Sequence, residues 1–189
     1  MSYLLAIDEK VLFVINNTLS HEILDPFFIF ITSKYQFGFV VGCFLIYFLY
    51  TNFTLRRLFW GLILAIALAD VLSARVFKKY FGRQRPCVVL AGKVRVPYKV
   101  KQGNSFPSSH ASNVFAAVGF LYIPFKAYVP GLVFLAATVA YSRVYLGVHY
   151  PSDVIAGGFG GFLLGIGVFC LIFREEKTGP QIEESTPEP

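Results

Sequence analysis

A twelve-residue stretch, residues 142–153, places an arginine, a histidine and an aspartate directly after an apolar segment: Arg143, His149 and Asp153. Ionisable groups at the end of a membrane-depth segment are costly to bury, so they usually face a partner, a cavity or a substrate. An imidazole with a carboxylate four residues later can act as an oriented nucleophile or base, and a nearby guanidinium can hold an anion. The stretch therefore indicates a catalytic site, the alternative being a helix end with its own salt bridge.

The composition indicates whether such a site would work in water or at a membrane. With 189 residues, of which 56% are hydrophobic, the chain has the size of one domain but is too apolar for an ordinary soluble one. A net charge of +6 would suit nucleic acid or an anionic surface, and the long apolar runs favour lipid headgroups over nucleic acid. The three cysteines, Cys43, Cys87 and Cys170, show no paired spacing, which argues against a disulfide framework or a zinc site.

Five apolar segments approach the roughly 20 residues needed to cross a bilayer, the shorter ones with help from their flanks or from local thinning. They are residues 37–51, 58–77, 111–125, 129–147 and 154–173. A helix over residues 3–15 should lie in the membrane interface, and a short apolar helix at residues 27–33 should dip into the bilayer or complete a sixth crossing. We therefore expect an all-α integral membrane bundle of five to six transmembrane helices in one domain, residues 1–173, followed by a disordered acidic tail, residues 174–189.

The alternation of these spans brings three distant segments to one membrane face. The long connection between residues 78 and 109 opens on the same side as the end of one later span and the start of the next. The ionisable residues that should meet there are Lys78, Arg85, His110, Arg143, His149 and Asp153.

Local signals in this connection predict how it begins and ends. Gly82 predicts that the helix carrying Lys78 stops before Arg85. At the other end, Ser108 and Ser109 precede an apolar run as helix N-caps do, and the free amides of a helix N-terminus bind anions. His110 would then sit in the first helical turn, beside a bound anion.

Three motifs on this face resemble those of the type 2 phosphatidic acid phosphatase superfamily, which also includes vanadium haloperoxidases and bacterial acid phosphatases. Three spaced motifs in the family's order are a specific signal, although they cover little of the chain. The first motif matches Lys78, Arg85 and Pro86; the second matches Pro107, Ser108 and His110, with Ser109 in place of the family's glycine; the third matches Ser142, Arg143, His149 and Asp153.

The resemblance implies phosphoryl transfer through a phosphohistidine. His149 would attack phosphorus while Asp153 holds its ring, and His110 would protonate the leaving alkoxide and later activate water. The cations and amides implied to neutralise the phosphoryl oxygens belong to Lys78, Arg85, Arg143, Ser108 and Ser109. Fixed cations would thus do the work of a metal, so we expect no metal and no other cofactor.

Some charged residues have more than one interpretation. Four cations in nine positions without an acid, Lys93, Arg95, Lys99 and Lys101, suit a rim for an anionic headgroup. Arg83 is interpreted equally as a solvated flank or a substrate contact, and Asp70 as an internal hydrogen-bond partner. The positive-inside rule would place this basic face in the cytoplasm, whereas membrane-bound members of the family place the site on the periplasmic face, which we follow here.

The expected activity is hydrolysis of a lipid phosphomonoester by a multi-pass protein of the bacterial inner membrane, with the lipid substrate and the bilayer as partners and no nucleic acid. The favoured headgroup is lipid A 1-phosphate; phosphatidylglycerophosphate and undecaprenyl pyrophosphate are alternatives. A different class of protein is also consistent with these cations: a lipid transporter or scramblase that uses them to pass headgroups, or a phosphotransferase with an acceptor other than water. The oligomeric state is not determined by the sequence.

Overall fold

The computed structural model describes residues 2–33, 52–98 and 103–174, and every regular element in these ranges is a helix. The predicted all-α class is therefore confirmed for this part of the chain. The predicted span at residues 37–51, the rim residues Lys99 and Lys101, and the tail after Arg174 lie outside the described residues.

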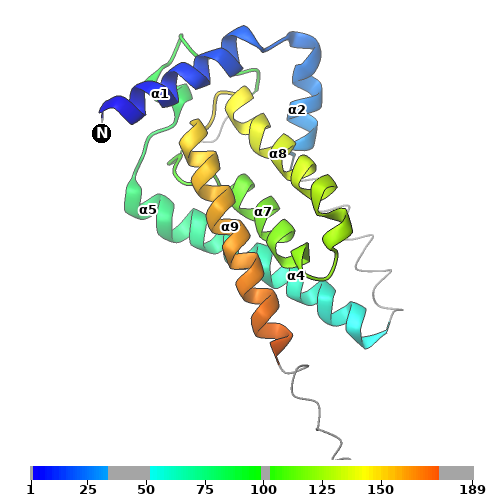
Figure 1. The fold of residues 1–189 in the computed structure, drawn as a ribbon. Coiled ribbons are helices and arrows are strands. Elements are labelled where there is room, and N and C mark those ends of the chain that lie inside the picture. The colour runs from blue at the N-terminus through cyan, green and yellow to red at the C-terminus, as the bar shows by residue number, and fades with distance from the viewer. Residues whose placement is uncertain (1, 34–51, 99–102, 175–189) are drawn as a thin grey trace, which may run out of the picture.

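A central helix, α7 (Ser109–Tyr122), organises the bundle. It is surrounded by α4 (Phe53–Val71), α8 (Val129–Tyr145) and α9 (Pro151–Ile172), as Figure 1 shows. The core between them includes Ala65 of α4, Phe120 of α7 and Val168 of α9. The serines predicted to cap a helix do begin α7, with Ser108 as the N-cap residue.

Glycines allow α9 to approach α7 more closely than other residues would. A Cβ atom on Gly161 would lie 2.1 Å from the carbonyl oxygen of Ser112, and one on Gly165 would lie 2.1 Å from that of Ala116. Small residues that let two backbones meet are typical of helix interfaces in membranes, where apolar side chains gain little by leaving lipid. The close approach fixes the start of α9 beside the start of α7.

Helix α4 runs on through a π-helical segment (Leu72–Phe77) into α5 (Lys78–Phe81). It ends at Gly82, whose φ of 60° is left-handed, so the predicted stop between Lys78 and Arg85 is confirmed. The short helix α6 (Pro86–Val89) follows.

The N-terminal segment lies across one end of the bundle. Helix α1 (Ser2–Phe13) crosses the end at which α8 stops and α9 starts, and α2 (Asp25–Ile31) descends beside α8 (Figure 1). Between them are a π-helical turn (Val14–Thr18) and a 3-10 turn (Glu22–Leu24). The predicted N-terminal helix is thus present, while its place in the membrane interface stays a prediction.

Three described segments are long and apolar enough to cross a membrane: Phe53–Val89, Lys126–Tyr145 and Pro151–Ile172. Large apolar side chains such as Phe134, Ile155 and Leu171 on α8 and α9 are mostly exposed. The 14 residues of α7 span only about 21 Å, less than the hydrocarbon core. The predicted count of five to six crossings therefore stays a prediction.

Candidate active site

The second motif is fastened to the third by backbone contacts. The Ser108 amide donates to the Asp153 carbonyl at 2.9 Å, and the Ser108 hydroxyl caps α7 by accepting from the Ala111 amide at 3.5 Å. Since the Ser108 amide is already bonded to the Asp153 carbonyl, only the Ser109 amide is left of the two that were predicted to bind the anion. Ser109 is buried, and its hydroxyl has no hydrogen-bond partner among the described residues.

A tight turn after α8 returns His149 towards Arg143. The amides of Val148 and His149 both donate to the Arg143 carbonyl at 3.2 Å. Gly147 makes the turn with a left-handed φ of 70°, and a Cβ there would lie 2.5 Å from a Val94 methyl carbon. Gly147 was not among the predicted site residues, although a glycine between an arginine and a histidine is a signal that could have indicated this turn.

The side chains of His149 and Asp153 are both almost fully buried, and His149 Nδ1 lies 3.4 Å from Asp153 Oδ2. The same carboxylate oxygen accepts from the Tyr150 amide at 2.9 Å. When Nδ1 carries the proton and faces the carboxylate, the lone pair is on Nε2, the nitrogen that would attack. The geometry thus suits the predicted orienting role of Asp153.

Arg83 braces Asp153 from the other side. Its Nη1 donates to Asp153 Oδ1 and to the Ser152 hydroxyl, both at 2.7 Å, and its Nη2 donates to Asp8 Oδ2 at 2.8 Å. The guanidinium also lies 3.9 Å from the centre of the Tyr150 ring. Arg83 therefore supports Asp153 from inside the protein and is not a solvated flank. Its second partner, Asp8, could not be predicted from the position of Asp8 on a helix face.

Three other cations lack such compensation. Among the described residues, no carboxylate forms an ion pair with Lys78, Arg85 or Arg143. Arg85 Nε donates to the Gly103 carbonyl at 3.2 Å, and an Arg143 terminal nitrogen donates to the Thr32 hydroxyl. Arg143 is only 5% exposed, yet its Nε has no partner in the described part of the chain.

These cations act on the two histidines. Burial lowers the pKa of His110 and that of His149 well below the usual value, and the charge of Arg143 lowers both further. The charges of Arg85 and Lys78 also lower the pKa of His149. Both imidazoles are therefore neutral at neutral pH until an anion enters, and the structure brings together the residues that the span alternation predicted.

The basic loop is only partly near this cluster. Arg95 is bound to Asp25, with Nη1 2.7 Å from Oδ1, and that carboxylate also lies 3.0 Å from the Tyr145 hydroxyl. Its guanidinium is thus committed to the protein and not to the predicted headgroup rim. The Lys93 carbonyl accepts from the Asn17 side chain at 2.9 Å, which leaves the rim role of the Lys93 ammonium group a prediction.

Asp70 has the structural role that the sequence indicated. Its Oδ1 accepts from the Asn113 side-chain amide at 3.0 Å, which links α4 to α7. In the described ranges, no three histidine, cysteine, aspartate or glutamate side chains gather as a metal-binding group.

Residues 58–177 match the family model described as the PAP2 superfamily. The chain belongs to the PAP2 superfamily. This membership confirms the resemblance drawn from the three motifs. Three described segments are long and apolar enough to span a membrane, and the chain is a multi-pass membrane protein of a family of lipid phosphatases, which are phosphoric monoester hydrolases.

Individual relatives agree in fold and class. A lipid A 4'-phosphatase of Porphyromonas gingivalis is 32% identical over 172 residues, covering 87% of this chain and 72% of the relative. Phosphatidylglycerophosphatase B of Bacillus subtilis is 31% identical over 132 residues, 64% of this chain and 60% of the relative. The crystal structure of Aquifex aeolicus LpxE aligns with a TM-score of 0.71 at 28% identity, over 86% of this chain and 94% of that one.

Proposed function

We propose that the protein hydrolyses a phosphomonoester of lipid A through a phosphohistidine intermediate. The observation that carries the proposal is the cluster of Lys78, Arg85 and Arg143, which no described carboxylate pairs, around the buried His149 and the half-buried His110. A buried cation without a counter-ion is costly. A phosphate dianion supplies the missing charge, and it also offers acceptors to Arg143 Nε and the Ser109 hydroxyl, both buried and unpartnered among the described residues.

The same geometry supports the individual steps. His149 Nε2 attacks phosphorus, and the bond from phosphorus to the leaving oxygen breaks as His110 gives that oxygen a proton. The incoming dianion raises the pKa of His110, so that it holds this proton in the complex. Water then attacks the phosphohistidine, His110 takes up a proton from it, and phosphate leaves. Throughout, Asp153 holds the His149 ring and the cations neutralise the phosphoryl oxygens.

The headgroup is proposed from the relatives. The lipid A 4'-phosphatase that is 32% identical favours lipid A, and its name favours the 4' phosphate over the 1-phosphate predicted from the sequence. Phosphatidylglycerophosphate is the second candidate, because a relative that is 31% identical carries that name. We further propose that the site faces the periplasm from the inner membrane.

A substrate panel with a chelator present tests this proposal. Purified protein in detergent is offered lipid A, phosphatidylglycerophosphate, phosphatidate and undecaprenyl pyrophosphate with excess EDTA, and inorganic phosphate is measured. We expect the fastest release from lipid A, and mass spectrometry of the product identifies whether the 1 or the 4' phosphate was removed. Lipid transport in vesicles without phosphate release would instead support a transporter.

The intermediate is tested separately by rapid quenching with substrate labelled in its phosphate. Wild-type protein should carry an acid-labile, alkali-stable label, and His149→Ala should carry none and lose about a hundredfold to ten-thousandfold in turnover. A label of equal amount on His149→Ala would overturn the nucleophile assignment. The orientation of the site is tested by labelling Cys87, at the site end, in whole cells with a membrane-impermeant maleimide.

A further inference from the structure

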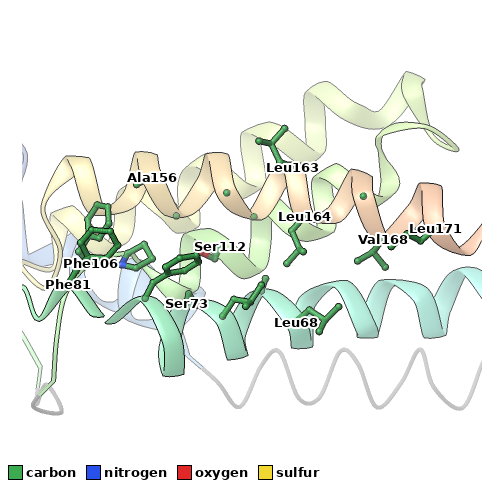
Figure 2. A pocket seen from close by; sticks show the side chains of 18 residues that line it. Leu68, Ser73, Phe81, Phe106, Ser112, Ala156, Leu163, Leu164, Val168 and Leu171 are labelled. Carbon is green, nitrogen blue, oxygen red and sulfur yellow. The ribbon is translucent and has the colours of Figure 1, made fainter. Parts of the chain in front are cut away.

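An apolar groove lies between α4 and α9, with a volume of about 650 Å3. It extends from Phe81 and Phe106 at one end to Leu171 at the other, as Figure 2 shows. Of its eighteen lining residues, only Ser73 and Ser112 have polar side chains. The Ser73 hydroxyl already donates to a backbone carbonyl of its own helix, at 3.2 Å, so the groove is built for a ligand that makes few hydrogen bonds.

Four of the glycines of α9 form two pairs that differ in what surrounds them. Gly161 and Gly165 are buried against the backbone of α7 and are required there, as described above. Gly160 and Gly167 line the groove, and a Cβ atom on either would meet nothing within 4 Å among the described residues. A glycine inside a helix costs roughly 0.5–1 kcal/mol relative to alanine, and helix packing does not explain this second pair. Their effect is to keep the groove open.

The groove reaches the catalytic loop. Phe106 and Pro107 line its end and directly precede Ser108, Ser109 and His110 in the chain. Its two walls belong to segments that are long and apolar enough to cross a membrane, Phe53–Val89 and Pro151–Ile172. The groove therefore begins beside the residues that lead into the catalytic loop and runs along two segments that could cross a bilayer.

We propose that this groove holds one acyl chain of the lipid whose phosphate occupies the catalytic pocket, an inference that rests on the proposed function. Its volume lies within the roughly 300–1,000 Å3 of small-molecule sites. Because the surrounding lipid tails are as apolar as the groove, the free energy of binding an acyl chain there comes from shape and packing rather than from leaving water. Attachment to a phosphate held by the cations keeps the chain at a high effective concentration beside the groove.

Filling the groove with a side chain tests this. Gly160→Leu and Gly167→Leu place a leucine in the open space at two depths. Gly131→Leu on α8 is the matched control, because a Cβ there also meets no described residue within 4 Å but Gly131 does not line the groove. The Michaelis constant for lipid A and the inhibition constant for orthovanadate, which has no chain, are measured for each variant. We expect the two groove variants to raise the Michaelis constant at least about fivefold, since overpacking costs ~1–3 kcal/mol, and to leave vanadate inhibition within about twofold.

The outcomes separate this inference from the proposed function. If the wild type releases no phosphate from lipid A, the proposed function fails. If the wild type is active but both groove variants keep its Michaelis constant, or match Gly131→Leu, the acyl-chain site is overturned. A parallel loss of lipid A turnover and vanadate inhibition in both groove variants would also overturn it, because the effect would then not act through the chain.

Discussion

The arginines at the polar end of the molecule fall into two groups. Arg83 and Arg95 each bind carboxylates, and those carboxylates include Asp8 and Asp25 of the N-terminal segment. Arg85 and Arg143 stand near the two histidines, and no described carboxylate forms an ion pair with either. All four lie in the three motifs or in the connection between the first two, so residue type alone does not show which arginine belongs to which group.

The difference shows how one protein uses the same guanidinium for two purposes. A carboxylate partner neutralises the charge and fixes a loop, and such a cation contributes to the fold. A buried cation without a partner destabilises the empty protein and retains its charge for a ligand. Arg83 connects the two groups, because it neutralises Asp153 and thereby holds the carboxylate that orients His149.

The largest expected effect comes from removing an unpaired cation. Arg143→Gln should lower kcat/KM for lipid A by about 10²–10³, the usual cost of a lost oxyanion-stabilising donor. The melting temperature in detergent should not fall, because the substitution removes a buried charge that has an unpartnered nitrogen in the described structure. Retention of more than a tenth of the activity would place Arg143 outside the site.

An intermediate effect is expected for the connecting arginine. Arg83→Gln should lower kcat by about tenfold, as loss of an outer partner of a catalytic group commonly does, and should leave KM within about twofold. Asp8→Asn is the matched variant, since it removes the far half of the brace and keeps the bond from Arg83 to Asp153. It should lose less activity than Arg83→Gln, and an equal or greater loss would show that the brace does not act through Asp153.

A paired cation away from the histidines should affect stability and not turnover. Arg95→Gln should lower the stability by roughly 1 kcal/mol, which is about 2–4 °C in melting temperature, because it leaves Asp25 without its main partner. kcat/KM should stay within about twofold of the wild-type value. Adding Asp25→Asn should cost less than the sum of the two single changes, as a double-mutant cycle would measure. A large loss of activity in Arg95→Gln would restore it to the predicted headgroup rim.

The smallest effect concerns the pH dependence of stability. The pKa values of His110 and His149 are lowered in the folded protein, whereas in the unfolded chain they stay near the usual 6.5. The stabilisation of the folded protein that comes from these two neutral histidines is therefore fully present above pH 6.5. It is lost as the pH falls below 6.5, because only the unfolded chain then gains the protons. The melting temperature should drop between pH 6.5 and 5, and orthovanadate should reduce the drop by raising the pKa of His110. An unchanged drop with saturating vanadate would contradict an anion beside His110.

The sequence predicted the elements of this site well where the signals are local. Gly82 ended a helix and Ser108 began one, as their conformational preferences require. The alternation of apolar spans then sufficed to bring His110 and His149 to one end of the bundle.

Contacts between distant segments could not be predicted in the same way. Asp8 is 75 positions from Arg83, and Asp25 is 70 from Arg95, so periodicity and spacing carry no information on which carboxylate meets which cation. The same limit applies to the groove. Gly160 and Gly161 are neighbours in sequence and both line the groove. Only the packing of α7 against α9 shows that Gly161 also meets the backbone of α7, whereas Gly160 borders open space among the described residues.

The most direct test of this division is the affinity for orthovanadate, an anion that mimics the phosphoryl group, measured by titration calorimetry on the wild type, Arg143→Gln and Arg95→Gln. The account predicts that Arg143→Gln binds vanadate at least about thirtyfold more weakly, a cost of roughly 2 kcal/mol, and that Arg95→Gln binds it as the wild type does. Equal weakening in the two variants, or none in Arg143→Gln, would contradict the claim that the unpaired cations form the phosphate site.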